Sequence, residues 1–396
     1  MKLCWIVPDD RGGGVISVVV SLCQAAVKEG HEVTLLMLRE PTGWMGELGD
    51  VQLVSLGLSP EHSDSPRGFK AWLDDNPQHV VFFNSCEEAD QAIPFIRRET
   101  RCVYVVHDTA ARYWRTALRC EKELDAIVAV SETVAKCFQR RLVNPDKLSV
   151  LVNGSKYPPK PHASIAREDA LLFLGGDNAT KGAEDMLRVW GELARSGFGG
   201  QLHWFGSVSD RFRARVGTVD KAERLHLHGR TTREVIFEVA AECKVLMMLS
   251  RVEPFGMATI EGMSMGTIPV AWDIPTGTRE IADSSIGRFA PLGDYTALAV
   301  CVVDACHCHP DVVEAVMQRA RYEFSDTAMW LRYAEMMERL MVACPGVRVR
   351  ASEHPQRYKP RFRFFHLLPG PVRCFLKHVA ARIPRFGYIV RDLRGI

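Results

Sequence analysis

The chain has 396 residues, of which 47% are hydrophobic and 25% are charged. This balance is typical of a folded protein with room for two domains, and it excludes a collagen-like, disordered or disulfide-rich chain. No apolar run reaches the ~18 residues of a membrane-spanning helix, so none is expected. The net charge of +2 conceals a basic C-terminal tail, because residues 346–396 hold 12 Lys and Arg against 2 Asp and Glu.

The 12 cysteines follow no disulfide framework. The N-terminal segment is too short and too acidic for a signal peptide, so we expect free thiols in a reducing, cytoplasmic compartment. One cluster, Cys306-His307-Cys308-His309, contains metal-binding residue types. It lacks a second ligand pair at a suitable spacing, and alternate residues of a helix point apart, so no metal site is predicted.

Short apolar runs alternate with amphipathic segments along the first part of the chain. A strand at 3–7 leads through the turn Gly12-Gly13-Gly14 into a helix at 15–29. Strands that alternate with helices predict a parallel, doubly wound α/β sheet, in which ligands bind beyond the carboxyl ends of the strands. Further strands are expected at 33–38, 51–55, 80–83, 102–106, 126–130 and 148–152, and helices at 87–98 and 131–141.

Pro158, Pro159 and Pro161 mark a linker, after which the same pattern starts again. Strands are expected at 170–174, 201–205, 225–228, 245–249 and 267–271, and helices at 181–196 and 232–242. The sequence therefore predicts two Rossmann-like domains that face each other across a cleft. The expected divisions are an N-terminal domain at 1–157, a linker at 158–168, a C-terminal domain at 169–345 and the basic tail at 346–396.

The stretch from Ser250 to Gly266 is the most informative part of the chain. The strand at 245–249 leads into a loop with Glu253, then Gly256, then a short helix that carries Glu261. Glycine lets backbone N–H groups approach a ligand closely, and a helix N-terminus favours phosphate. Two carboxylates that flank such a turn suit a ligand with hydroxyl groups at two places and a phosphate between them.

The spacing Glu253-x7-Glu261, with Pro254-Phe255-Gly256 after the first Glu, resembles the E-x7-E signature of retaining GT-B glycosyltransferases, especially family 4. The resemblance extends over about residues 1–345. It implies the GT-B fold, a nucleoside-diphosphate sugar as donor, and no metal or other cofactor. It further implies that the domain at 1–157 binds the acceptor and the domain at 169–345 binds the donor. It also implies that Glu253 holds sugar hydroxyls and Glu261 the ribose. Backbone N–H groups would come from Phe255, Gly256 and Met257.

Three residues of the N-terminal domain are assigned through the same resemblance. In relatives the loop equivalent to Gly13 and Gly14 lies against the donor phosphates and the acceptor, although a plain tight turn explains the glycines equally well. His107 follows the strand at 102–106. Family 4 members commonly have a His there that contacts the donor sugar, whereas a lone His is otherwise more often structural.

The expected phosphate clamp departs from the family pattern Gly-Arg-x4-Lys-Gly. Lys181 and Gly182 match its end, but Gly176 stands at the Arg position. The loss of one cation should reduce stabilisation of the departing pyrophosphate. We expect Arg251 to supply the missing charge, and Arg230 is the other candidate.

Together these features predict a retaining glycosyltransferase that acts on an acceptor hydroxyl, with a lipid-linked or cell-surface glycan as the expected acceptor. No side-chain nucleophile is evident. In the family a donor phosphate oxygen is thought to take the acceptor proton, so the protein contributes positioning and charge stabilisation. Two alternatives stay open: a nucleotide-sugar epimerase of GT-B fold, and a non-catalytic scaffold subunit of a glycosyltransferase complex. No nucleic-acid recognition module is present, so no nucleic acid is expected.

The tail suggests a membrane partner. A basic amphipathic helix with aromatic residues on its apolar face suits an anionic membrane surface, where each cation adds roughly 1 kcal/mol. We therefore expect peripheral association with the inner face of the membrane. The alternative is that the apolar stripe packs back on the N-terminal domain. The stripe at helical spacing consists of Val372, Phe375, Leu376, Val379, Ala380 and Ile383.

Overall fold

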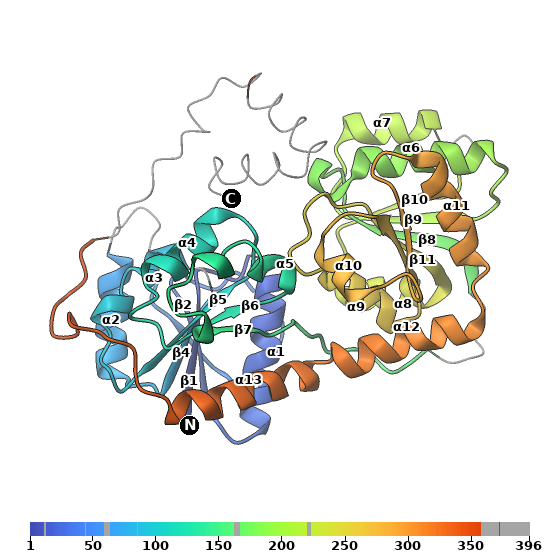
Figure 1. Ribbon diagram of the computed structural model, residues 1–396. Helices are drawn as coiled ribbons and strands as arrows, with labels where there is room; N and C mark the ends of the chain where they lie inside the picture. Colours follow the sequence, from blue (N-terminus) through green and yellow to red (C-terminus); the bar gives the residue numbers. More distant parts are fainter. Residues whose placement is uncertain are drawn as a thin grey trace. The chain divides into compact units, whose positions relative to one another are not determined.

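The computed structural model describes residues 1–11, 13–43, 45–58, 64–84, 86–161, 167–219, 223–357 and 372. The chain forms two compact units. Among the described residues, the first unit contains 1–156 and 326–357, and the second contains 157–325 and 372. Each unit has a parallel sheet with helices on both faces (Figure 1). This confirms the prediction of two doubly wound α/β domains.

The first sheet has seven parallel strands in the order β3-β2-β1-β4-β5-β6-β7. The order reverses between β1 and β4, and ligands of such sheets bind at the carboxyl ends of the strands near this switch point. The central strands β4, β5 and β6 are mostly apolar and fully buried because both faces are covered, whereas the edge strands β3 and β7 are only partly buried. They are β1 (Lys2–Val7), β2 (Glu32–Met37), β3 (Gln52–Ser55), β4 (Val80–Phe83), β5 (Arg101–Val106), β6 (Ala126–Ala129) and β7 (Leu148–Val150).

Two of the predicted helices in this unit are shorter than expected. The segment 87–98 forms one helical turn, α3, followed by a 3₁₀ turn at Ile93–Phe95, because Pro94 has no N–H with which to continue the helix. The segment 131–141 likewise divides into α5 and a 3₁₀ turn at Gln139–Arg141. The helices are α1 (Gly14–Lys28), α2 (Ser65–Asp75), α3 (Glu87–Asp90), α4 (Ala111–Arg119), α5 (Glu132–Ala135) and α13 (Asp326–Val342), with a further 3₁₀ turn at Pro145–Lys147.

The second sheet has six parallel strands in the order β10-β9-β8-β11-β12-β13, with its switch point between β8 and β11. Its strands are β8 (Glu168–Leu174), β9 (Gln201–Phe205), β10 (Leu225–Gly229), β11 (Cys243–Met248), β12 (Ile268–Trp272) and β13 (Arg288–Ala290). Its helices are α6 (Ala183–Arg195), α7 (Asp210–Val219), α8 (Arg233–Glu242), α9 (Met257–Ser264), α10 (Gly277–Ile281), α11 (Tyr295–Cys306) and α12 (Pro310–Glu323), and Ala179–Lys181 is a 3₁₀ turn. Within the described part of the chain no single helix is long and apolar enough to span a membrane. The pair α11 and α12 has the length and composition of a span when the two helices are taken together, but it is bent by 97°.

The second unit ends earlier in the chain than expected. Residues up to 345 were expected in the donor domain, but the chain returns to the first unit at Asp326, where α13 begins. Tyr333 of α13 is fully buried and packs 5.9 Å from the ring of Phe82, which itself stacks on Trp5. Figure 1 shows α13 (orange-red) alongside α1. The apolar face of α13 therefore completes the first unit's core, a role that helical periodicity alone could not assign.

The described start of the tail, residues 346–357, packs on the first unit. Arg348 is fully buried, forms an ion pair with Asp125, and donates to the carbonyl oxygens of Glu123 and Thr100 at 2.9 Å each. Farther along, Arg357 pairs with Asp64 at 3.0 Å. This part of the tail is thus a structural strap. Apart from Val372, the residues of the predicted amphipathic stripe lie outside the described residues.

The buried Arg348–Asp125 pair predicts a large difference between two arginines of the strap. Replacing Arg348 with Met removes one of the two cations that pair with the buried Asp125 carboxylate and leaves only Arg101, at 3.2 Å, so the free energy of unfolding should fall by about 3 kcal/mol. Replacing Arg357 with Met removes a solvent-exposed pair and should cost less than ~1 kcal/mol. Urea unfolding of both variants measures this, and equal shifts of the two midpoints would contradict a structural role for Arg348.

Candidate functional site

Two loops meet at the switch point of the second sheet. One follows β8 and contains Lys181, and the other follows β11 and contains Glu253. Because β8 and β11 are adjacent parallel strands, both loops leave the same edge of the sheet. Lys181 Nζ lies 2.8 Å from Glu253 Oε2, and the two side chains are 39% and 10% exposed. The structure therefore brings together the two second-unit residues that were predicted to act in catalysis.

Backbone hydrogen bonds fix these loops. The amide of Arg251 donates to the carbonyl of Thr180 at 3.3 Å, which links the two loops one residue before Lys181. The amide of Gly277, at the start of α10, donates to the carbonyl of Glu253 at 2.7 Å. These two main-chain hydrogen bonds hold the loops of Lys181 and Glu253 close enough for the ion pair to form.

Helix α9 begins beside the carboxylate. Its N-cap, Gly256, has a φ of +109° and makes no side-chain cap. A Cβ at Gly256 would lie 2.9 Å from Thr259 Oγ1, so both the backbone conformation and the space favour glycine. The first N–H groups of a helix have no intrahelical acceptor. This turn, from Phe255 to Met257, is therefore suited to an anion next to Glu253.

Glu261 lies in the second turn of α9 and pairs with a residue that the sequence analysis missed. Both Arg233 Nε and Arg233 Nη2 reach Glu261 Oε1, at 3.0 and 2.8 Å. Arg233 is the first residue of α8, and its guanidinium also lies 4.9 Å from the ring centre of Phe237. No local pattern reveals the pair, because its members belong to different helices and are 28 residues apart.

Arg251, the expected substitute for the missing cation, is buried and pairs with a carboxylate of its own unit. Its side chain is 7% exposed and forms an ion pair with Asp185 of α6, which also accepts from the Tyr295 hydroxyl at 2.8 Å. The guanidinium lies 5.5 Å from the ring centre of Trp272. Arg251 is therefore a buried link between the loop after β11 and helix α6. Its charge is balanced inside the unit.

Gly176 lies in a turn that has no room for a side chain. Its φ is +52°, and a Cβ there would lie 2.5 Å from the Ser207 carbonyl oxygen. The Gly176 carbonyl also accepts from the indole N–H of Trp204 at 2.9 Å. An arginine at this position is incompatible with this backbone. The other candidate cation, Arg230, is exposed just after β10.

The predicted residues of the first unit lie at the carboxyl ends of its strands. Gly13 is the N-cap of α1, and Gly14 is the first residue of that helix, while Gly12 lies outside the described residues. His107 follows β5, and its Nε2 lies 3.0 Å from Asn84 Oδ1. The Asn84 amide nitrogen donates to two carbonyls, Ile6 O at 3.2 Å and Phe82 O at 3.1 Å.

These contacts determine the tautomer of His107. Since the amide nitrogen of Asn84 is the donor to carbonyls, its Oδ1 must accept, and His107 Nε2 must carry the proton. Burial lowers the pKa of His107 to about 4, so the imidazole is neutral near pH 7. A neutral imidazole protonated at Nε2 presents Nδ1 as an acceptor, the group needed to receive a hydrogen bond from a hydroxyl.

The cluster at residues 306–309 is divided among local contacts. Cys308 Sγ accepts from Arg288 Nη2 at 3.0 Å, His307 Nδ1 lies 2.7 Å from the Val303 carbonyl, and His309 caps α12. Among the described residues no group of three or more His, Cys, Asp or Glu side chains is arranged to hold a metal ion.

Both units have the fold of the GT-B glycosyltransferases. The chain belongs to these enzymes through both of its halves. Residues 12–155 match the family model Glycosyltransferase Family 4, and residues 168–307 match the model Glycosyl transferases group 1. The second match contains Lys181, Glu253 and Glu261.

Individual relatives are distant. The chain is 25% identical over 172 residues to GDP-mannose:cellobiosyl-diphosphopolyprenol alpha-mannosyltransferase of Xanthomonas campestris, a match to 41% of this chain and 43% of that protein. In structure it is similar to Anabaena HepE in complex with UDP and glucose, with a TM-score of 0.69, 14% identity, and 86% and 100% of the two chains covered. Sucrose-phosphate synthase of Thermosynechococcus elongatus has a TM-score of 0.71 at 17% identity, with 86% and 98% covered.

The different surroundings of Lys181 and Arg251 predict different effects of their loss. Lys181→Met should weaken the binding of a nucleoside diphosphate about tenfold or more while stability changes little, because the side chain is partly exposed. Arg251→Met leaves Asp185 buried without its charged partner and should lower the free energy of unfolding by about 3 kcal/mol. Calorimetry and urea unfolding separate the two. An Arg251→Met protein of normal stability that fails to bind diphosphate would overturn this assignment.

The lowered pKa of His107 predicts a pH-dependent contribution to stability. Between about pH 4 and 6.5 the unfolded chain binds a proton at this residue and the folded chain does not, so stability falls as the pH is lowered through this range. His107→Gln, which can still donate to Asn84, removes this contribution. The wild type should therefore lose more stability than the variant between pH 7.5 and 5 in urea unfolding. Identical losses would contradict a neutral, buried imidazole.

Proposed function

We propose that the protein is a retaining glycosyltransferase that moves a sugar from a nucleoside-diphosphate sugar to an acceptor hydroxyl. The observation that carries the proposal is the Lys181–Glu253 pair beside the N-terminus of α9, at the switch point of the second sheet. This edge is where open α/β sheets bind ligands. It offers a cation and backbone N–H groups for a diphosphate, and a carboxylate for sugar hydroxyls.

Each residue then has a defined role. Glu253 accepts hydrogen bonds from sugar hydroxyls. These hydrogen bonds become stronger in the transition state, because positive charge develops at the anomeric carbon. Lys181 and the N–H groups of Phe255, Gly256 and Met257 take up the charge of the departing diphosphate, so the proposed reaction uses no metal or other cofactor. Glu261 accepts from the ribose.

In the first unit, we propose that His107 accepts a hydrogen bond from a donor-sugar hydroxyl through Nδ1. The Nε2–H bond to Asn84 fixes the ring for this task. The N-terminus of α1, at Gly13 and Gly14, is suited to an anionic group. No side-chain nucleophile is assigned. A donor phosphate oxygen takes the acceptor proton, and the protein contributes orientation and electrostatic stabilisation.

The nature of the substrates is supported by relatives. One is named for GDP-mannose and a diphosphopolyprenol-linked acceptor, and a structural neighbour was solved with UDP and glucose. We propose a nucleotide sugar as donor and a lipid-linked or cell-surface glycan as acceptor. A basic tail on an enzyme at the inner, cytoplasmic face of the membrane would suit a lipid-linked acceptor.

The carboxylate roles predict distinct kinetic effects. Glu253→Ala should lower kcat by on the order of 10²–10³, because its contacts strengthen in the transition state. Glu261→Ala should mainly raise the donor KM. Glu238→Ala, on the exposed face of α8, is the matched control and should change neither.

The assay uses a panel of nucleotide sugars with and without acceptor. Slow release of nucleoside diphosphate identifies a transferase, an isomerised donor would identify an epimerase, and no reaction with any donor would favour a scaffold. Equal, small effects of the Glu253 and Glu261 changes would contradict the assigned roles.

The proposed membrane contact predicts vesicle binding that depends on residues after the strap. The full chain should sediment with anionic vesicles, less so at high salt, and a chain that ends at Arg357 should not. Ending the chain at Arg357 keeps the Arg348–Asp125 pair, so the shortened protein should stay folded. If both proteins remain in the supernatant, the tail does not dock to membranes.

A further inference from the structure

A cavity lies in the second unit, away from the Lys181–Glu253 pair. Its volume is about 650 Å³, within the range of small-molecule sites. Arg167 precedes β8, Lys244 lies near the start of β11, and Ile268 is the first residue of β12, so the cavity is at the amino ends of the strands. Six residues of β11 at ~3.3 Å each place it about 20 Å from the Glu253 loop.

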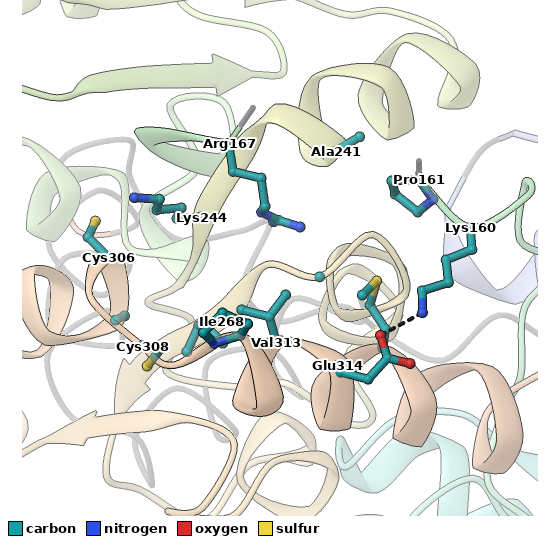
Figure 2. Close-up of a pocket in the computed structure, with 14 residues that line it drawn as sticks. Lys160, Pro161, Arg167, Ala241, Lys244, Ile268, Cys306, Cys308, Val313 and Glu314 are labelled. Atoms are coloured by element: carbon teal, nitrogen blue, oxygen red, sulfur yellow. Dashed lines mark hydrogen bonds and ion pairs between the residues drawn. The ribbon is translucent and has the colours of Figure 1, made fainter. Parts of the chain in front are cut away.

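The lining combines an apolar wall with cations. Ile268, Val313 and Met317 contribute aliphatic surface, together with alanines and prolines. Figure 2 shows the Arg167 side chain extending toward the space in front of Ile268 and Val313, with Lys244 on the same side. A ligand that fits must therefore offer apolar surface to one wall and polar, anionic atoms to the other.

The charges on this wall are not equally balanced. Lys244 pairs with Asp169 at 2.6 Å, and Lys160 pairs with Glu314 at 2.5 Å. Arg167 has no carboxylate partner among the residues that the structure describes. Its terminal nitrogens donate to the carbonyls of Met265 and Cys243.

Arg167 also retains an unused donor. Its Nε is buried without a hydrogen-bond partner within the described ranges. Burial lowers the pKa of the guanidinium to about 10, as expected for a cation that has lost water and gained no countercharge. A buried cation of this kind is stabilised by an incoming anion, and a guanidinium matches the geometry of carboxylate and phosphate groups.

We propose that this cavity binds an amphipathic anion, a small molecule with a phosphate or carboxylate head and an aliphatic body. The head pairs with Arg167, and the body lies on Ile268, Val313 and Met317. The site is separate from the donor site and does not depend on the proposed reaction. Arg167 also donates to the carbonyl of Met265, the C-cap of α9, so the ligand is linked through Arg167 to the helix that carries Glu261.

Calorimetry with octyl phosphate and octanoate below their micellar concentrations tests the proposal on the full chain. At least one probe should bind, and Arg167→Gln should weaken it about tenfold or more because a charged partner is lost. Val313→Trp should abolish binding by filling the cavity. Ala315→Trp, an exposed position on the same helix, is the matched control and should leave affinity unchanged. Saturating UDP or GDP should not displace the probe.

Several outcomes would overturn the proposal. Failure of both probes to bind excludes the site, and displacement by UDP or GDP means that the probe occupies the donor site. Equal affinity for inorganic phosphate excludes a role for the apolar wall, and equal affinity for octanol excludes a role for Arg167. If Arg167→Gln fails to fold, the comparison of Val313→Trp with Ala315→Trp decides alone, and unchanged binding in Val313→Trp contradicts the site.

Discussion

The ion pair between Lys181 and Glu253 requires two loops from adjacent strands to stay in one relative position. A lysine side chain is flexible, and a partly exposed pair contributes little stability by itself. The position must therefore come from the backbone. It does so through backbone hydrogen bonds, which the Arg251 amide donates to the Thr180 carbonyl and the Gly277 amide to the Glu253 carbonyl, and through the buried ion pair of Arg251 with Asp185. Lys181 and Glu253 therefore lie on loops that backbone hydrogen bonds hold in place, and the buried charge of Arg251 beneath them is balanced by Asp185.

The backbone around Gly176 explains why the arginine of the family pattern is missing. The Ser207 carbonyl and the Trp204 indole lie so close to Gly176 that no side chain fits there. Lys181 is then the only cation of the family clamp pattern that remains in the described loops. In the proposed site, the N–H groups at the start of α9 therefore take a larger share of the diphosphate charge. Such groups need no rearrangement when charge develops, which suits a site of low net positive charge.

Much of the fold could be predicted, because strand and helix periodicities are local properties of the sequence. The Glu253 and Lys181 positions followed from the motif and from the rule that ligands bind at carboxyl ends of strands. The partners of charged residues could not be predicted. Arg251 pairs with Asp185, Glu261 with Arg233, and Arg348 with Asp125, each across long sequence separations. The assignment of α13 to the first unit also depends on tertiary packing, since its apolar stripe would fit either domain.

The most direct test of this account is a crystal structure of the protein with a bound nucleoside diphosphate. The account predicts the diphosphate against Lys181 and the N–H groups of Phe255, Gly256 and Met257, with the ribose hydroxyls on Glu261 and Arg251 still paired with Asp185. A diphosphate bound elsewhere, or one held by Arg251 after its pair with Asp185 has opened, would contradict it.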